Sequence, residues 1–328
     1  MFDTPLNIFL FCLFVVIGIV ILSFACFLII SRILYYMLLT RTSKEKWGRH
    51  VSEMTPDQVA MYDEGLVWQK EHDQFKKELH IVNENHNLYA EYYDFGFDRA
   101  IIFVPGRTEG LGYGYFFAKP YRECGFNVLT IDQRAHGLSD GKYPALGFDE
   151  HRDLIKWAEL LHNDFNVKSI VFHGICIGSS CALQALVSEN APSYLDGLIA
   201  EGMYPNFYES FKNHMIELKQ PISPVLQMVN MWFKHYTGHS MRRGNIDFID
   251  KLEKPILMIH SKEDAYSLPE RANDLYNKIS HNKKKIFWYE HGAHSKLRFL
   301  DPQAYDNAIK EFLTTYATVG SNQQGFRR

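Results

Sequence analysis

The residues best suited to chemistry form the motif Gly174-Ile175-Cys176-Ile177-Gly178. The motif follows the apolar run SIVFH and opens a predicted helix that begins with small residues, which gives it a strand–turn–helix context. A turn this sharp holds its central residue in a strained conformation, and glycine two positions away on either side avoids a Cβ clash. Cys176 is therefore the candidate nucleophile, and the helix N-terminus behind it favours a thiolate and a developing oxyanion.

A nucleophilic cysteine needs a base, and the base needs a group that orients its ring. The apolar run PILMIH leads to Asp264, and the later run KIFWY leads to His294, so both side chains would stand on loops after strands. We expect His294 to take the thiol proton and later to protonate the leaving group, while Asp264 orients the imidazole. Glu263 competes with Asp264 for the acid role, and His291 competes with His294 for the base role.

Two backbone N–H groups are candidates for an oxyanion hole. One belongs to Ile177, directly after the nucleophile, and the other to Arg107, in the loop FVPGRTEG after the first predicted parallel strand. Gly106 allows the backbone of this loop to approach a substrate closely. The Arg107 side chain adds a cation that either favours an anionic substrate group or is simply solvated.

The order of these motifs resembles that of the α/β-hydrolase superfamily across nearly all of residues 75–318. The segment LTIDQRAHGLSDG resembles the family's D-x-R-x-H-G-x-S loop, HGAHS resembles its histidine loop, and HSKED resembles its acid loop, with Ser261 replacing the usual Gly. The resemblance implies that four residues of the first loop support the active-site floor, namely Asp132, Arg134, His136 and Ser139. Within the superfamily, the chain is most similar to small-lid bacterial hydrolases with an N-terminal membrane anchor, loosely grouped as esterases or acyl hydrolases.

The chain departs from the family at Cys176, where serine is usual. Cysteine nucleophiles do occur on this fold. Cys176 resembles those of dienelactone hydrolases and of bile-acid-type acyl-CoA:amino acid acyltransferases. A thioester acyl-enzyme reacts with amines as well as with water. We therefore expect an acyl hydrolase that acts on esters, thioesters or lactones through Cys176, His294 and Asp264. An acyltransferase with the same triad and a non-catalytic membrane-tethered binding module are the alternatives.

The elements that must position these residues alternate along the chain between strands and helices. After a hairpin over 78–93, we expect strands over 100–104, 127–131, 169–173, 195–201, 255–260 and 285–289. Helices are expected over 55–77, 110–124, 148–163, 178–188, 268–279 and 302–315. This alternation implies βαβ units, so the predicted fold class is α/β, a mostly parallel doubly wound sheet with a small helical lid, preceded by one transmembrane helix.

The same pattern gives the domain boundaries. The stretch of about 204–250 interrupts the alternation and is rich in methionine and aromatic residues, so we expect a lid insertion over the sheet's carboxyl edge. We predict a transmembrane anchor over 1–40, a basic juxtamembrane segment and polar helix over 41–78, and the hydrolase domain over 79–318. Residues 319–328 are predicted to form a polar, disordered tail.

The N-terminal segment Leu6–Ile30 contains no charged side chain. As a helix it would span roughly 37 Å, enough to cross a hydrocarbon core of about 30 Å. A cleaved signal peptide would have a basic start, whereas this chain begins Met1-Phe2-Asp3. We therefore expect an uncleaved transmembrane helix, with a buried core helix as the alternative.

Charges that flank this segment predict its orientation. Basic residues lie on its C-terminal side, at Arg32, Arg41, Lys44, Lys46 and Arg49. The positive-inside rule then places a single-pass protein in the cell membrane with its catalytic domain in the cytoplasm. Tyr35, Tyr36 and Trp47 would fit an aromatic belt at the membrane interface.

Composition excludes several classes of protein. With 46% apolar residues, 22% charged residues and a net charge of −3, the chain is neither a polytopic transporter, nor disordered, nor a strongly basic nucleic-acid binder. It has no phosphate-cradling loop, dinucleotide fingerprint or metal-ligand spacing, so we expect no cofactor and no metal. The expected partners are a small acyl substrate, lipid-like compounds included, and the membrane; the oligomeric state stays open.

The five cysteines are too irregularly spaced for a disulfide framework, which favours a reduced body. Cys12 and Cys26 lie in the membrane segment, and we expect Cys124 and Cys181 to be packed in the body. Cys176 is therefore the one cysteine with a predicted chemical role.

Overall fold

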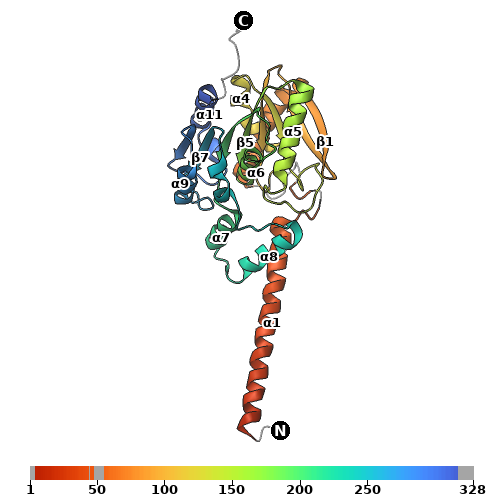
Figure 1. Cartoon of the computed structure of the whole chain (residues 1–328), viewed down its shortest axis with the longest axis vertical. Coiled ribbons are helices and arrows are strands. Elements are labelled where there is room, and N and C mark those ends of the chain that lie inside the picture. Colours follow the sequence, from red (N-terminus) through yellow and green to blue (C-terminus); the bar gives the residue numbers. More distant parts are fainter. Residues whose placement is uncertain (1–3, 44, 48–54, 317–328) are drawn as a thin grey trace.

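The computed structural model describes residues 4–43, 45–47 and 55–316 of the chain. A long helix, α1 (Pro5–Leu39), extends from an α/β body that contains every other described helix and strand (Figure 1). The tail predicted over 319–328 lies outside the described residues, as do Lys44 and Arg49. The molecule thus consists of one projecting helix and a body that carries the predicted site.

Within the described residues the body is built on one sheet, with the spatial order β1-β2-β4-β3-β5-β6-β7-β8. The β1-β2 and β2-β4 pairs are antiparallel, and all other neighbouring strands run parallel. The strands are β1 (Lys76–Asn83), β2 (His86–Tyr93), β3 (Arg99–Val104), β4 (Asn127–Ile131), β5 (Ser169–Ile175), β6 (Leu195–Glu201), β7 (Ile256–Ser261) and β8 (Lys284–Tyr289). The predicted α/β fold class is confirmed.

Helices cover both faces of this sheet (Figure 1). The helices outside the lid are α2 (Pro56–Glu71), α3 (Tyr113–Phe117), α4 (Lys119–Glu123), α5 (Glu150–Phe165), α6 (Ile177–Leu186), α9 (Pro269–Lys278), α10 (Leu297–Leu300) and α11 (Pro302–Tyr316). In β3, Ile102 and Val104 join the apolar cluster of α5 and α6, whereas Ile101 and Phe103 join that of α3 and α11. Alternate residues of a strand point to opposite faces, which explains why the central strands are apolar throughout.

Two helix predictions were wrong in their extent. Helix α2 ends at Glu71 rather than Lys77, because a 3₁₀ turn, η1 (Asp73–Phe75), follows it and β1 begins at Lys76. The single helix predicted over 110–124 is two short helices. Pro120 has no N–H to donate to the Phe116 carbonyl, and that carbonyl instead accepts a hydrogen bond of 2.6 Å from the Arg298 guanidinium.

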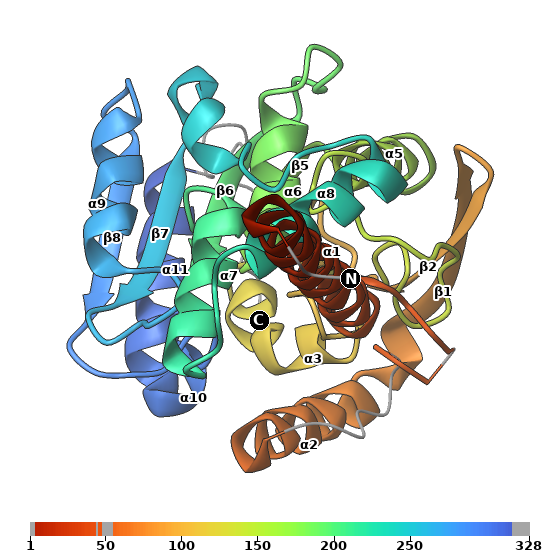
Figure 2. The same ribbon diagram turned by 90° about the horizontal axis from the view of Figure 1, so that it is seen from below.

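The stretch between β6 and β7 forms a helical lid at the carboxyl edge of the sheet. It contains α7 (Phe207–Glu217), α8 (Val225–Thr237) and two short 3₁₀ turns, η2 (Asn245–Asp247) and η3 (Ile249–Lys251). Both lid helices lie beside the C-terminal end of α1, as the view from below shows (Figure 2). The lid therefore stands between the sheet's carboxyl edge and the projecting helix.

Helix α1 is docked on α8 through its last turns. The Trp232 indole N–H donates to the Ser31 hydroxyl at 3.1 Å, and the Arg32 guanidinium lies 4.9 Å from the centre of the Tyr236 ring. Tyr35 stacks on Tyr236 with 5.4 Å between ring centres. These contacts join α1 to the lid rather than to the sheet.

Two of the three aromatic residues predicted to form a belt at the membrane interface are buried within the protein. Tyr35 is fully buried, and Trp47 is buried with its ring stacked on His136. Tyr36 is exposed on α1. Aromatic residues next to a hydrophobic segment can thus serve packing within the protein as well as an interface.

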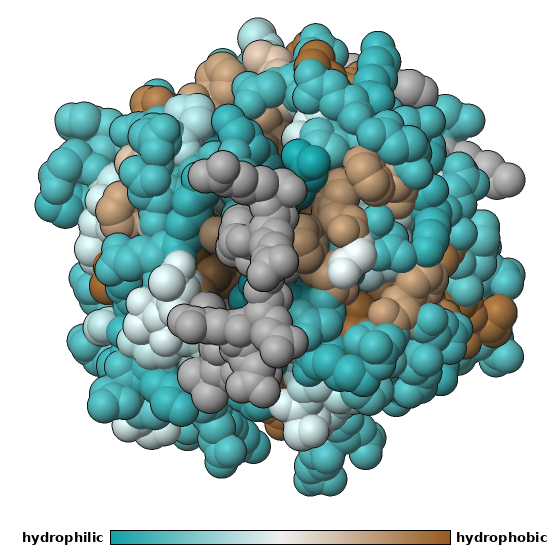
Figure 3. Space-filling view, turned by 90° about the horizontal axis from the view of Figure 1, so that it is seen from above, coloured by the Kyte–Doolittle hydropathy of each residue, from teal (hydrophilic) through white to brown (hydrophobic). Residues whose placement is uncertain are grey.

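Helix α1 is long and apolar enough to cross a membrane, and its most apolar stretch makes no contact that buries it in the body. The face of the body remote from α1 is largely hydrophilic, with scattered apolar side chains (Figure 3). Among the described residues, most of the exposed large apolar side chains lie on α1.

Candidate active site

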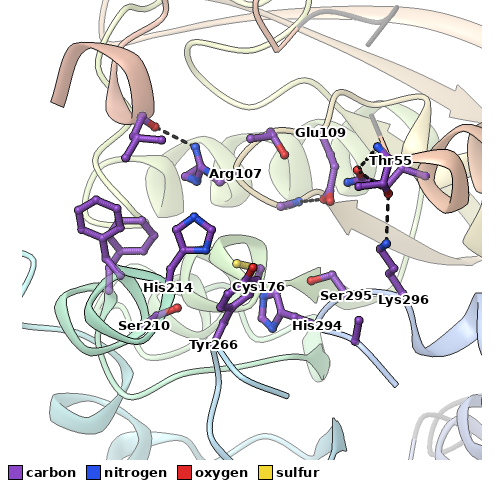
Figure 4. Close-up of a pocket in the computed structure, with 17 residues that line it drawn as sticks. Thr55, Arg107, Glu109, Cys176, Ser210, His214, Tyr266, His294, Ser295 and Lys296 are labelled. Carbon is purple, nitrogen blue, oxygen red and sulfur yellow. Dashed lines mark hydrogen bonds between the residues drawn. The ribbon is translucent and has the colours of Figure 1, made fainter. Parts of the chain in front are cut away.

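Cys176 sits at the junction of β5 and α6, in the strained conformation that the motif predicts. Its φ is 54° and its ψ is −113°, and its N–H donates to the Glu201 carbonyl at 2.9 Å. A Cβ at Gly174 would collide with the backbone of α6, and one at Gly178 would collide with the Val104 carbonyl. The two glycines are therefore required by close backbone approach, and they leave the Cys176 side chain facing the pocket (Figure 4).

The structure pairs His294 with Asp264. The imidazole Nδ1 lies 2.7 Å from the Asp264 carboxylate, and both side chains are largely buried. The same carboxylate accepts the N–H groups of Tyr266 and Ser267 at 2.8 Å each. Burial raises the pKa of Asp264, but the charge of His294 and these hydrogen bonds outweigh it and leave the pKa below its usual value. Asp264 is thus an ionised group that fixes the ring orientation.

On its other side the imidazole faces Cys176 (Figure 4). Burial lowers the pKa of His294, but the charges of Asp264 and Cys176, with a hydrogen bond to each, raise it well above its usual value. Beneath the ring, Gly202 adopts a φ of +61°, and a Cβ there would stand 2.8 Å from the imidazole Cε1. Gly202 therefore makes room for the histidine, a role that no sequence motif predicted.

The competing pair, Glu263 and His291, lies outside this site. The His291 Nδ1 is 2.8 Å from the Glu263 carboxylate, with the side chains 79% and 58% exposed, respectively. Neither residue lines the pocket that contains Cys176. The geometry thus favours Asp264 and His294 over their neighbours.

The loop after β3 brings Gly106 and Arg107 to the pocket opposite Cys176 (Figure 4). The Gly106 N–H donates at 2.7 Å to Glu109, a buried carboxyl whose pKa is raised by burial. The Arg107 carbonyl lies 2.6 Å from the His136 ring, and its guanidinium donates at 2.9 Å to the Leu38 carbonyl of α1. The side chain of Arg107 is therefore tied to α1.

Ile177 begins α6, so its N–H points from the helix N-terminus that adjoins Cys176. Together with the Arg107 backbone it is placed beside the nucleophile, in the positions that the motif predicts for oxyanion donors. The Gly106 N–H, by contrast, is occupied by Glu109. Ile177 and Arg107 are the better candidates.

The loop after β4 is held in place next to the site by hydrogen bonds and an ion pair. Asp132 accepts the N–H groups of Leu111 and Leu138 at 2.9 Å, and the Ser139 hydroxyl donates to the Asp132 carbonyl at 2.7 Å. Arg134 forms a buried ion pair with Asp153. These contacts agree with the supporting role that the family resemblance implies for this loop.

The pocket is a cavity of about 320 Å³ whose walls come from separate parts of the chain. Helix α7 contributes Phe207, Ser210, Phe211 and His214, helix α1 contributes Leu38, and α2 and the residue before it contribute Gln58 and Thr55. Tyr266 closes the side below His294 (Figure 4). Sequence reasoning missed these residues because no motif connects them, although helical spacing within the lid places four of them on one face of α7.

The other two cysteines of the body differ from Cys176. Cys181 is fully buried, lies 3.2 Å from the Gln133 side chain, and has its pKa raised well above the usual value by burial. Cys124 is half-buried, and burial raises its pKa as well. Neither lines the pocket, so both serve as internal references for labelling of Cys176.

The sheet order, the strained turn after β5 and the acid and histidine loops after β7 and β8 together define the class. The chain belongs to the α/β-hydrolase fold family. The family model for the alpha/beta hydrolase fold matches residues 99–220. Protein YqkD of Bacillus subtilis (strain 168) is 33% identical over 219 residues, which cover 65% of this chain and 70% of YqkD.

Solved structures share the fold at low sequence identity. The Pyrococcus furiosus esterase Pf2001 superposes with a TM-score of 0.65 at 20% identity, covering 83% of this chain and 97% of that one. The esterase EaEST from Exiguobacterium antarcticum gives a TM-score of 0.53 at 16% identity, covering 73% and 100%. At these identities the likeness shows the fold, and the chemistry has to be argued from the site.

Proposed function

We propose that the chain is a membrane-anchored acyl hydrolase that cleaves ester or thioester bonds through Cys176. The observation that carries the proposal is the 2.7 Å contact of Asp264 with His294, whose ring interacts with Cys176 on its other side. A nucleophile at a sharp turn, a base beside it and a buried carboxylate behind the base form the arrangement needed for acyl transfer.

In the first half-reaction, the Cys176 sulfur attacks the acyl carbonyl carbon while His294 holds the thiol proton. The N–H groups of Ile177 and Arg107 stabilise the negative oxygen of the tetrahedral intermediate. The bond to the leaving group then breaks, the leaving alcohol or thiol takes the proton from His294, and a thioester remains on Cys176.

In the second half-reaction, water attacks the thioester carbonyl and gives a proton to His294. Collapse of the second intermediate releases the carboxylic acid, and the proton returns to the Cys176 sulfur. Asp264 stabilises the imidazolium in both halves without being protonated itself.

Anchoring is supported by the length and composition of α1 and by the docking of its last turns on the lid. The basic residues after α1 favour a cytoplasmic body, although Arg41 also donates to the carbonyls of Gly137 and Ser139 within the body. A reporter fused to the C-terminus of the full chain tests the orientation. A cytoplasmic signal is expected, and a periplasmic or extracellular signal would contradict it.

The enzymatic part of the proposal is tested with a panel of p-nitrophenyl esters, thioesters and lactones. Cys176→Ala is expected to abolish turnover and the trapped thioester seen by intact-protein mass spectrometry, because the attacking sulfur is lost. Cys124→Ala, which removes a thiol outside the pocket, is the matched control and should keep both. Full activity in Cys176→Ala would exclude the mechanism.

A further inference from the structure

The active-site pocket shares a wall with the projecting helix. Leu38, in the last turn of α1, lines the cavity, and its carbonyl accepts the hydrogen bond from Arg107. If α1 spans a membrane, as the proposed function requires, the site cannot lie far from the bilayer surface. The inference below rests on that proposed function.

The contacts between α1 and α8 fix how close the lid comes to the bilayer. The first charged residue after the apolar segment is Arg32, and Ser31, directly before it, accepts the hydrogen bond from Trp232. Arg32 lies 5.5 Å from the Trp232 ring and 4.9 Å from the Tyr236 ring. Tryptophan, tyrosine and arginine at the end of an apolar helix are typical of the membrane–water interface, so α8 lies at that level.

The side of the lid away from the pocket exposes apolar side chains. In α7 and just after it, Ile216 and Leu218 are 53% and 52% exposed, and Met231 in α8 is 46% exposed. None of the three lines the pocket, and Ile216 lies on the face of α7 opposite the residues that do. Exposed apolar side chains on a lid that is docked on an apolar helix are suited to contact with lipid.

The distance from the lid contact to the pocket is short. From Ser31 to Leu38, α1 rises roughly 10 Å, at about 1.5 Å per residue. The polar headgroup region on one side of a bilayer is about 5–8 Å thick. The pocket therefore stands just above the headgroups, where a single-chain lipid can enter it from the leaflet.

We propose that the outer face of the lid rests in the membrane interface and that the pocket takes single-chain acyl esters, such as a monoacylglycerol, directly from the leaflet. The cavity of about 320 Å³ lies at the small end of ligand sites and suits one chain rather than two. Phe207, Phe211 and Leu38 supply apolar walls for that chain. The ester carbonyl would then meet Cys176 at the base of the pocket.

The test uses the full chain in phosphatidylcholine vesicles and compares two substrates. One is a monoacylglycerol carried in the vesicles, and the other is p-nitrophenyl butyrate in solution. The double variant Ile216→Glu/Leu218→Glu is expected to lose roughly tenfold or more of its activity on the vesicle substrate, because the charges would have to enter the interface. Turnover of the soluble ester should stay unchanged, which also shows that the variant folds.

Val67→Glu is the matched control, because Val67 is 57% exposed on α2, outside the lid, and its neighbour Trp68 packs on Tyr93 of β2. It should leave both rates unchanged. Equal vesicle rates for Ile216→Glu/Leu218→Glu and Val67→Glu would overturn the inference. Cleavage of the diacyl phosphatidylcholine as fast as that of the monoacylglycerol would also overturn it.

Failure of the proposed function would look different. In that case the soluble ester would be left intact by the wild type or would still be cleaved by Cys176→Ala. If only the lid inference is wrong, turnover of the soluble ester still depends on Cys176. The vesicle rate of Ile216→Glu/Leu218→Glu then equals that of the wild type.

Discussion

At the scale of single residues, two carboxyl–imidazole pairs on the same two loops differ in burial. Asp264 and His294 are buried beside Cys176, whereas Glu263 and His291 are exposed. We expect Asp264→Asn to lower kcat by roughly 10³–10⁴-fold, because the imidazole would lose its orientation and the stabilisation of its charge. Steady-state hydrolysis of a p-nitrophenyl ester measures this.

Glu263→Gln is the control for that variant, since it removes the neighbouring carboxylate without touching the pocket. An exposed ion pair contributes little, so activity should stay within about twofold of the wild type. A large loss in Glu263→Gln with a small loss in Asp264→Asn would reverse the assignment of the acid.

The identity of the nucleophile should be visible in the pH profile. In the wild type, kcat/KM is expected to fall as pH rises through the raised pKa of His294, because the imidazolium must protonate the leaving group. In Cys176→Ser, His294 must be neutral to accept the hydroxyl proton, so the residual activity should fall as pH drops instead. If kcat/KM changed with pH in the same direction in the wild type and in Cys176→Ser, a thiolate–imidazolium pair would be contradicted.

Gly202 provides a test of how tightly His294 is held. Alanine there would place its Cβ 2.8 Å from the imidazole Cε1, so we expect Gly202→Ala to lower kcat by roughly tenfold or more through misplacement of the ring. Gly96→Ala separates this effect from backbone strain, because Gly96 also has a positive φ, +83°, but no atom within 4 Å of the added methyl group. Equal losses in both variants would point to strain alone.

Much of the site could be predicted from the sequence, because Cys176, Asp264 and His294 each follow an apolar strand within a short motif. Such motifs exist where the backbone itself imposes the residue type, as it does at Gly174 and Gly178. Glu109, by contrast, follows from no motif, since its importance depends on a hydrogen bond to Gly106 that only the folded loop creates. Lid and helix residues were missed for the same reason.

At the scale of elements, the last turn of α1 supports the loop after β3, here called the oxyanion loop because Arg107 is a candidate oxyanion donor. Arg107 donates from that loop to the Leu38 carbonyl, and Lys46 donates to the carbonyls of Tyr36 and Thr40 in the same turn. We expect Arg107→Ala to lower kcat by roughly tenfold with a smaller change in KM, because the loop would be held less firmly in the transition state.

Lys46→Ala is the matched control. It removes a cation that contacts the end of α1, and Lys46 does not line the pocket. Activity close to that of the wild type is expected from it. If both substitutions lowered kcat alike, the effect would belong to the anchoring of α1 rather than to the oxyanion loop.

The strands were more predictable than the helices. The strands β4 and β6 have the predicted bounds because buried parallel strands are continuous apolar runs. The break between α3 and α4 depends partly on Pro120, which is visible in the sequence, and partly on Arg298 from a segment far along the chain. Contacts of the second kind leave no local pattern.

At the scale of the whole molecule, the sequence separated an apolar helix from a globular body but did not predict how they meet. Ser31 and Trp232 are 201 residues apart in the chain, and only the fold brings them together. The consequence is that the helix, the lid and the pocket form one unit. Exchange of α1 for an unrelated apolar helix would remove this unit.

Stability of the whole molecule should depend on pH through Glu201, which is fully buried behind the site. Burial, only partly offset by hydrogen bonds from Tyr305 and the Leu297 N–H, raises the pKa of Glu201 to about 7. Between its usual pKa and 7 the folded protein keeps this proton and the unfolded chain releases it. The stabilisation is therefore complete at low pH and is lost as pH rises through 7.

Glu201→Gln cannot ionise and should lack this dependence. Buried His173 and His260, whose pKa values are lowered to about 3 and about 4, act in the opposite direction below neutral pH but are common to both proteins. We therefore expect the unfolding free energy of the wild type, minus that of Glu201→Gln, to fall by on the order of 3 kcal/mol between about pH 4.5 and 8. Denaturant titration of the detergent-solubilised full chain measures the difference, and a constant value across that range would mean that Glu201 is ionised throughout.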